Sequence, residues 1–122
     1  MPVRSYRELI AWQKAIDLVP AIYECTRSFP DCERFGLTSQ LRRAAVSVPS
    51  NIAEGQGRAS TGEFNQFLGH ARGSLLEIET QVFIARNLGF TATGDGELLL
   101  AKCAEVGRIL NGLMSSLRRK KR

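Results

Sequence analysis

Arginine is the residue type whose spacing in this sequence most suggests a chemical role. Arg42 and Arg43 are adjacent, and Arg72 and Arg86 are 14 residues apart, which would place this second pair on one face of a helix. A guanidinium group binds phosphate through a planar fork of N–H donors, so several on one surface could hold a nucleic acid. The alternative is that each arginine is solvated or weakly ion-paired, for instance with Glu79, which lies seven residues from both Arg72 and Arg86.

The carboxyl-terminal end of the chain is strongly basic. The sequence has 17 Lys and Arg against 12 Asp and Glu, and five of the basic residues are its last five, so residues 1–117 carry twelve of each sign. A basic tail on a neutral body attracts phosphates or acidic proteins, although such tails often serve only solubility. The candidate nucleic-acid-binding residues are therefore Arg42, Arg43, Arg58, Arg72, Arg86, Arg118, Arg119, Lys120, Lys121 and Arg122.

Residues suited to catalysis or metal binding are scarce. His70 is the only histidine, so a single chain cannot build a histidine-based metal cluster, and no G-x-S-x-G motif accompanies it for a Ser–His–carboxylate triad. Residues 57–63 have the glycine spacing of a phosphate-binding loop, but Glu63 stands where that loop has lysine and would repel phosphate. Glu77 and Glu79 would point to different sides of a helix. We therefore expect a protein that is not an enzyme, with no catalytic, cofactor-binding or metal-binding residues.

The cysteines and the hydropathy pattern indicate the compartment. Cys25, Cys32 and Cys103 are odd in number and form no C-x-x-C pair, so we expect reduced thiols, with Cys103 packed as a small apolar residue. The longest aliphatic run is residues 98–101, far below the roughly 20 residues of a membrane-spanning helix, and no apolar signal segment opens the chain. We expect a cytoplasmic protein without membrane contact.

Four segments have the apolar period of a helix, and none shows the sustained alternation of an exposed strand. The expected helices span about residues 5–28, 38–55, 60–89 and 95–117. Their expected inward residues are Leu9, Trp12, Ile16, Val19 and Tyr23 in the first; Leu41, Ala45, Val48 and Ile52 in the second; Phe64, Leu68, Ala71, Leu75, Ile78, Val82 and Ala85 in the third; and Leu99, Cys103, Val106, Leu110, Leu113 and Leu117 in the fourth.

The helix starts carry capping signals. Ser5 and Ser60 are each followed three residues later by glutamate, the spacing of a capping box, and Thr38 is the expected N-cap of the second helix. Proline lies inside the first two helices, so we expect a kink near Pro20 and an unpaired carbonyl four residues before Pro49.

Four helices with short connections predict an all-α fold, an antiparallel up-down-up-down four-helix bundle of residues 1–117, followed by a basic tail, 118–122. The inward residues of the last two helices alternate in steps of four and three, which is the seam of helices packed at shallow angles. Further apolar residues lie outside that seam, namely Phe67, Leu76, Phe83, Leu98, Leu100, Ile109 and Met114. They indicate either a wider core face or self-association, and we expect self-association.

Asn51 and Glu54 share a helix face just after Pro49. Their amide and carboxylate could satisfy backbone groups that the proline leaves unpaired, or they could bind a ligand. We expect the structural role.

Residues 35–55, FGLTSQLRRAAVSVPSNIAEG, resemble the bacterial four helix bundle protein family, whose members are encoded in intervening sequences of 23S ribosomal RNA genes. Shorter segments resemble the same family: AWQKA at 11–15, Phe67-Leu68 with ARGS at 71–74, and LNGL at 110–113. The resemblance spans residues 5–117, and Pro20 is its atypical position in the first helix.

This resemblance implies properties that the spacing of residues does not. It implies a homopentamer of four-helix bundles, similar also to the pentameric accessory protein of diversity-generating retroelements, which binds a reverse transcriptase and nucleic acid. It implies no established reaction. By position, it favours a basic surface at Arg42, Arg43, Arg58 and Arg72.

The sequence thus supports two hypotheses about function. The first is an oligomeric protein, not an enzyme, that binds RNA or DNA through basic surfaces, because repeated weak phosphate contacts add up through multivalency. The second is a scaffold or accessory module for another protein, for example a reverse transcriptase, whose basic tail serves only solubility.

Overall fold

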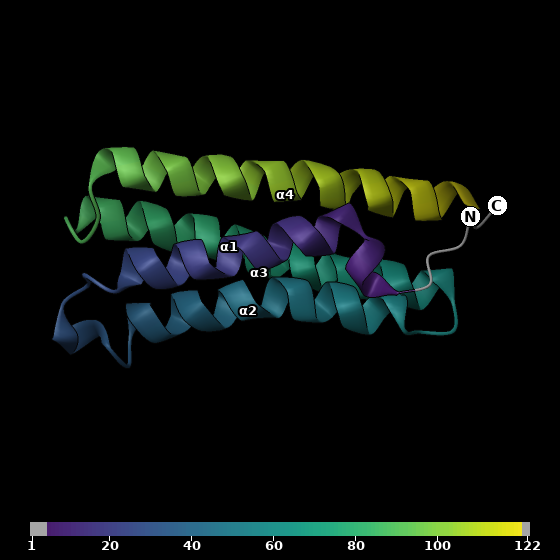
Figure 1. The fold of residues 1–122 in the computed structure, drawn as a ribbon, viewed down its shortest axis with the longest axis horizontal. Helices are drawn as coiled ribbons and strands as arrows, with labels where there is room; N and C mark the ends of the chain where they lie inside the picture. Colours follow the sequence, from purple (N-terminus) through teal and green to yellow (C-terminus); the bar gives the residue numbers. More distant parts are fainter. Residues whose placement is uncertain (1–4, 121–122) are drawn as a thin grey trace.

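The computed structural model of the chain describes residues 5–120, and all regular structure in this range is helical (Figure 1). Two short 3-10 turns, η1 (Tyr6–Glu8) and η2 (Asp31–Glu33), precede the first and second of four long helices. The long helices are α1 (Ile10–Thr26), α2 (Leu37–Gln56), α3 (Thr61–Asn87) and α4 (Thr93–Lys120).

The four long helices lie side by side and alternate in direction along one axis (Figure 1). Helix α2 packs against α1 and α3, and α4 packs against α3 and α1, so each helix contacts two neighbours. This arrangement confirms the predicted all-α, antiparallel up-down-up-down four-helix bundle.

The predicted seams of the last two helices form much of the core. Their residues are buried, except that Phe64 and Leu113 are only partly buried. Met114, which lies outside the predicted seam, is also in the core at 7% exposure. Leu76, Phe83 and Leu98 remain at least half exposed, so only some of the apolar residues outside the predicted seam belong to the core.

The predicted inward face of the first helix is wrong by one position. The buried residues of α1 are Ala11, Ala15, Leu18, Ile22 and Thr26. Ile16 and Tyr23, which we expected to point inward, are 39% and 38% exposed. The spacing is as expected, but the face is set by small alanines, which let α1 lie close to its neighbours and leave larger side chains such as Trp12 at the boundary.

The helix starts agree only in part with the capping signals. Ser60 caps α3 as predicted, since its Oγ accepts a hydrogen bond from the Glu63 backbone N–H at 3.1 Å. Ser5 caps η1 instead of α1, which begins at Ile10. The N-cap of α2 is Gly36 and not Thr38.

Both prolines lie inside helices that continue past them, Pro20 in α1 and Pro49 in α2. Gly57 is the C-cap of α2, and Gly89, with φ of +77°, follows α3, so a glycine stands at the end of each of these helices. Gly55, in contrast, is inside α2 and packs against α3, where an added Cβ would lie 2.7 Å from the Cβ of Phe67.

Helix α4 continues past residue 117, the predicted boundary between the bundle and the basic tail. Arg118 and Arg119 belong to its last turn, whereas Lys121 and Arg122 lie outside the described residues. Among the described helices, none combines the length and hydropathy that a membrane span requires.

Candidate nucleic-acid interface

Arg42 and Arg43 lie at a groove on the outside of α1 and α2, near the end of the bundle that carries η2. The groove has a volume of about 630 Å³, and we call it the arginine groove. Its lining residues are Tyr23, Arg34, Phe35, Thr38, Ser39, Arg42, Arg43, Val46 and Ser47. Three of these residues are arginines, and no carboxylate lines the groove among the residues that the structure describes.

Arg42 is held in place by α1. Its Nε donates to the Thr26 hydroxyl at 2.9 Å, and one of its terminal nitrogens donates to the Tyr23 carbonyl at 3.4 Å. Its guanidinium carbon lies 4.5 Å from the centroid of the Tyr23 ring, within cation–π range. Arg42 therefore joins α1 to α2 and forms a fixed positive wall of the groove.

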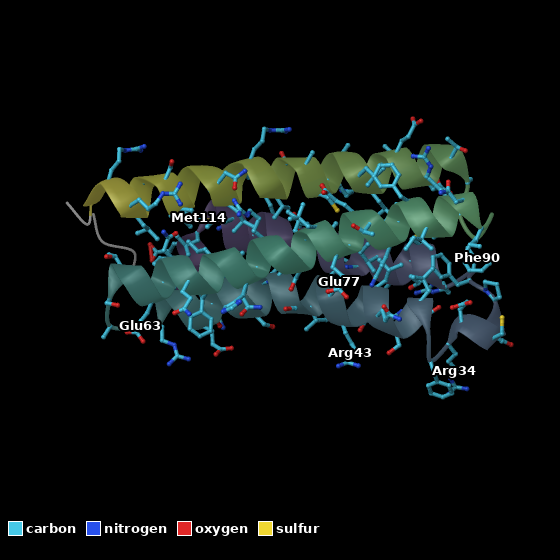
Figure 2. The ribbon with its side chains drawn as sticks, turned by 180° about the vertical axis from the view of Figure 1, so that it is seen from behind. Arg34, Arg43, Glu63, Glu77, Phe90 and Met114 are labelled. Carbon is cyan, nitrogen blue, oxygen red and sulfur yellow. The ribbon has the colours of Figure 1, made fainter. Side chains whose placement is uncertain are left out.

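Arg34 and Arg43 are the exposed cations of the groove, and both side chains lie on the outside of the bundle (Figure 2). Within residues 5–120, the side chain of Arg43 makes no hydrogen bond or ion pair. Arg34 contacts the ring of Phe35, with its guanidinium carbon 5.2 Å from the ring centroid. Both guanidinium groups are thus open to an anion from solution.

The connection between α1 and α2 places Phe35 in water. Glu33, the last residue of η2, accepts a hydrogen bond from the Leu37 backbone N–H at 3.0 Å and so caps the first turn of α2. Gly36 permits this cap, because a Cβ there would lie 2.8 Å from the Glu33 Oε1. The turn directs Phe35 away from the core, and its side chain is 88% exposed.

A polar seam between α2 and α3 adjoins the arginine groove. Ser47 and Ser74 share a hydrogen bond of 2.9 Å across the two helices. The buried Gln81 amide donates to Gln40 and Glu77 at 3.1 and 3.2 Å. Glu77 and Arg43 line a small notch in this seam and lie on the same side of the bundle, so a carboxylate lies beside the cationic groove (Figure 2).

The other predicted arginines lie outside the groove. Arg58 pairs with Glu54 at 3.3 Å and stacks on Phe67. Arg72 donates to the Asn111 side chain at 3.3 Å, and Arg86 lies over Phe83. None of the ion pairs among the described residues joins Glu79 to an arginine, so the pairing with Glu79, which the sequence allowed as one alternative for Arg72 and Arg86, is not observed.

The carboxyl-terminal end of α4, which carries Arg118 and Arg119, lies at the opposite end of the bundle from η2 (Figure 1). Arg118 and Arg119 are exposed on α4. Lys120 ends the described helix, and Lys121 and Arg122 lie outside the described residues. The structure therefore separates the predicted basic residues into a groove at one end, a helix terminus at the other, and single arginines between them.

The contacts of Asn51 support the expected structural role, with a different acceptor. Its side-chain amide donates to both the carbonyl and the hydroxyl of Ser47 at 2.9 Å. Pro49 leaves the carbonyl of Ala45 without its helical donor, and Asn51 does not bind that carbonyl. The expectation that Asn51 satisfies a group left unpaired by the proline is therefore wrong. Glu54 binds Arg58 and takes no part in these contacts.

The histidine is exposed, whereas Cys25 is half-buried and Cys103 is buried. His70 is exposed with its ring centroid 5.9 Å from that of Phe67. Burial is the main cause that raises the pKa of Cys25, and burial, with a smaller effect of Glu79, raises the pKa of Cys103 to about 12. Among residues 5–120, no three His, Cys, Asp or Glu side chains are arranged to hold a metal ion.

The sequence predicts only Arg42 and Arg43 among the residues that line the arginine groove, and the charged or aromatic residues that it does not predict there are Tyr23, Arg34 and Phe35. Tyr23 was assigned to the core from the wrong face of α1. Arg34 and Phe35 lie in a connection without helical period, so no spacing links them to Arg43. The available signal was local: an arginine beside a phenylalanine in a short turn, next to the Arg42–Arg43 pair.

Comparisons with known proteins agree with this fold. The family model described as 23S rRNA-intervening sequence protein matches residues 7–112. A crystal structure of a protein of unknown function from the S23 ribosomal protein family of Bacteroides thetaiotaomicron is similar, with a TM-score of 0.78 and 18% sequence identity. The similarity covers 86% of this chain and 98% of that one. No curated protein matches the chain.

Proposed function

Because the chain belongs to the 23S rRNA-intervening sequence protein family, we propose that it binds nucleic acid, RNA or DNA, through its basic surfaces and without catalysis. The observation that carries this proposal is the arginine groove, in which three arginines and no carboxylate line one hollow, counted over residues 5–120. Clustered guanidinium groups concentrate positive potential and bind phosphate oxygens with forked hydrogen bonds.

We propose that the protein acts as an assembly of several copies, with the homopentamer of the resembled family as the expected size. Exposed apolar residues support this proposal. Leu76 and Phe83 are seven residues apart on α3, which places them on one face, and they are 55% and 50% exposed. Copies joined through such a face would repeat the groove and the basic helix end, so that weak phosphate contacts add together.

Salt dependence tests the electrostatic part of this proposal. Fluorescence anisotropy with a labelled RNA oligonucleotide should show affinity falling steeply between about 50 and 200 mM salt, with little preference among sequences. The double variant Arg34→Gln/Arg43→Gln should weaken binding and flatten the salt slope. The matched control, Lys102→Gln/Arg108→Gln, removes the same charge from exposed positions on α4 and should change affinity less. A flat salt response, or equal losses in the two double variants, contradicts the proposed interface.

Assembly and the basic terminus need separate tests. Sedimentation velocity at micromolar concentration should give a species larger than 13.5 kDa. Removing residues 118–122 should lower RNA affinity and leave the sedimentation coefficient nearly unchanged. A monomer at this concentration contradicts the proposed assembly.

A second candidate function is a scaffold or accessory module that docks another protein, for example a reverse transcriptase. The observation that favours it is the exposure of Leu88 at the end of α3 and Leu98 near the start of α4, at 57% and 66%. Such a module should keep its partner when residues 118–122 are removed, whereas the nucleic-acid-binding protein should lose affinity for RNA.

A further inference from the structure

We propose that the arginine groove binds an unpaired nucleotide of a single-stranded nucleic acid, with the base stacked on Phe35 and the flanking phosphates held by Arg34 and Arg43. This inference rests on the proposed function and adds a specific ligand conformation to it. It also assigns a role to Phe35, which charge alone would not select.

The exposure of Phe35 is the first argument. Its side chain is 88% exposed, which is the largest exposed fraction of any large apolar residue in the described range. The ring belongs to the lining of a groove and is not covered by a neighbouring helix. A flat aromatic face presented to water is the surface on which proteins stack unpaired bases.

The positions of the cations are the second argument. Arg34 contacts the Phe35 ring, and Arg43 lines the same groove from the first half of α2. In a single strand, phosphates flank each base, so a stacking ring with arginines around it matches the order of groups in the ligand. Arg42 is held by Thr26 and Tyr23, so it contributes charge to the wall while its hydrogen bonds stay within the protein.

The geometry distinguishes a single strand from a duplex. Inside a duplex each base is stacked between its neighbours, so a side chain of the protein reaches its face only after the base is unstacked. Phe35 stands on a short turn at the mouth of the groove and not on a long element that could enter a major groove. Unpaired bases in loops, bulges or ends meet this requirement without that cost.

The test compares one single-stranded RNA 12-mer with its duplex, at fixed moderate salt, by fluorescence anisotropy. Phe35→Ala should weaken binding of the single strand about 5- to 150-fold, the range that corresponds to about 1–3 kcal/mol per stacked base. It should change duplex binding little. Phe35→Trp, which keeps an aromatic face, should retain the affinity, whereas Phe35→Leu, which keeps an apolar side chain, should behave as the alanine variant.

The outcomes separate this inference from the proposed function. Equal single-strand and duplex affinities, with Phe35→Ala harmless and Arg34→Gln/Arg43→Gln harmful, overturn base stacking while the basic interface stands. Failure of the unmodified protein to bind either RNA overturns the proposed function itself. A changed sedimentation coefficient in Phe35→Ala, with unchanged RNA affinity, assigns Phe35 to a contact between copies and also overturns this inference.

Discussion

Arg42 lies over the ring of Tyr23 with its guanidinium carbon 4.5 Å from the ring centroid, while its Nε donates to the Thr26 hydroxyl on the next turn of α1. Its neighbour Arg43 points outward from the same helix turn and has no such partner in the described part of the chain. Of these two consecutive arginines, Arg42 therefore binds within the bundle, whereas Arg43 is exposed to solvent.

Replacing Arg42 with alanine should therefore reduce stability. The change removes a hydrogen bond to a buried threonine hydroxyl and a cation–π contact, so the free energy of unfolding should fall by about 1–2 kcal/mol. Arg43→Ala should alter it by less than about 0.5 kcal/mol and should weaken RNA binding more than stability. Urea denaturation and anisotropy on the same preparations measure both effects. Equal stability losses in the two variants contradict this division of roles.

The close contact at Gly55 predicts a strong effect of one methyl group. Alanine there would place a Cβ 2.7 Å from the Phe67 Cβ and 3.0 Å from the Phe64 ring, so α2 and α3 would have to move apart. Overpacking of this kind costs about 1–3 kcal/mol. Gly73→Ala is the control, since its Cβ would meet nothing within 4 Å, and it should stabilise α3 by up to about 1 kcal/mol. In both thermal and urea unfolding, the midpoint should therefore fall for Gly55→Ala and rise for Gly73→Ala.

Asn51→Ala should lower the melting temperature without affecting RNA binding. The variant loses two hydrogen bonds to Ser47, at a cost of about 1–2 kcal/mol. Ser47 also bonds to Ser74 of α3, so the loss should loosen the seam between α2 and α3. Unchanged melting together with reduced binding would instead assign Asn51 to a ligand.

Cys103 predicts a pH effect whose sign follows from its raised pKa. The folded thiol keeps its proton to about pH 12, whereas an unfolded cysteine loses it near pH 8.5. The contribution of Cys103 to stability is therefore complete below about pH 8.5 and decreases as the pH rises toward 12. Between pH 8 and 10, the stability advantage of the unmodified protein over Cys103→Ala should shrink by about 2 kcal/mol in urea unfolding. Cys25 and Cys32 are present in both proteins, so their titration cancels, and a constant difference contradicts the assignment.

The sequence is a better guide to the bundle than to the interface, for a physical reason. Long apolar seams such as the one from Phe64 to Ala85 contain seven inward positions, so a single misjudged residue leaves the pattern intact. The face of α1 was misassigned because small alanines, and not the larger Ile16 or Tyr23, meet the neighbouring helices.

The arginine groove depends on contacts between segments that are distant in sequence. The spacing identifies Arg42 and Arg43 as a pair but gives no sign that Arg42 is bound by Tyr23 and Thr26, 19 and 16 residues earlier. The exposure of Phe35 depends on the cap that Glu33 provides to α2, and a cap of this kind does not change the periodicity of apolar residues in the sequence.

Helix α2 separates the turn that carries Phe35 from the end of the bundle where α4 finishes (Figure 1). Its 20 residues extend about 30 Å at about 1.5 Å each. An oligonucleotide that touches both ends of one subunit must cover that length, which corresponds to roughly nine nucleotides of a strand that keeps the B-form spacing of about 3.4 Å each. The length of the bundle thus sets a minimum length for the ligand. Shorter oligonucleotides can contact only one end of a subunit, and affinity should rise stepwise once the strand is long enough to reach both ends.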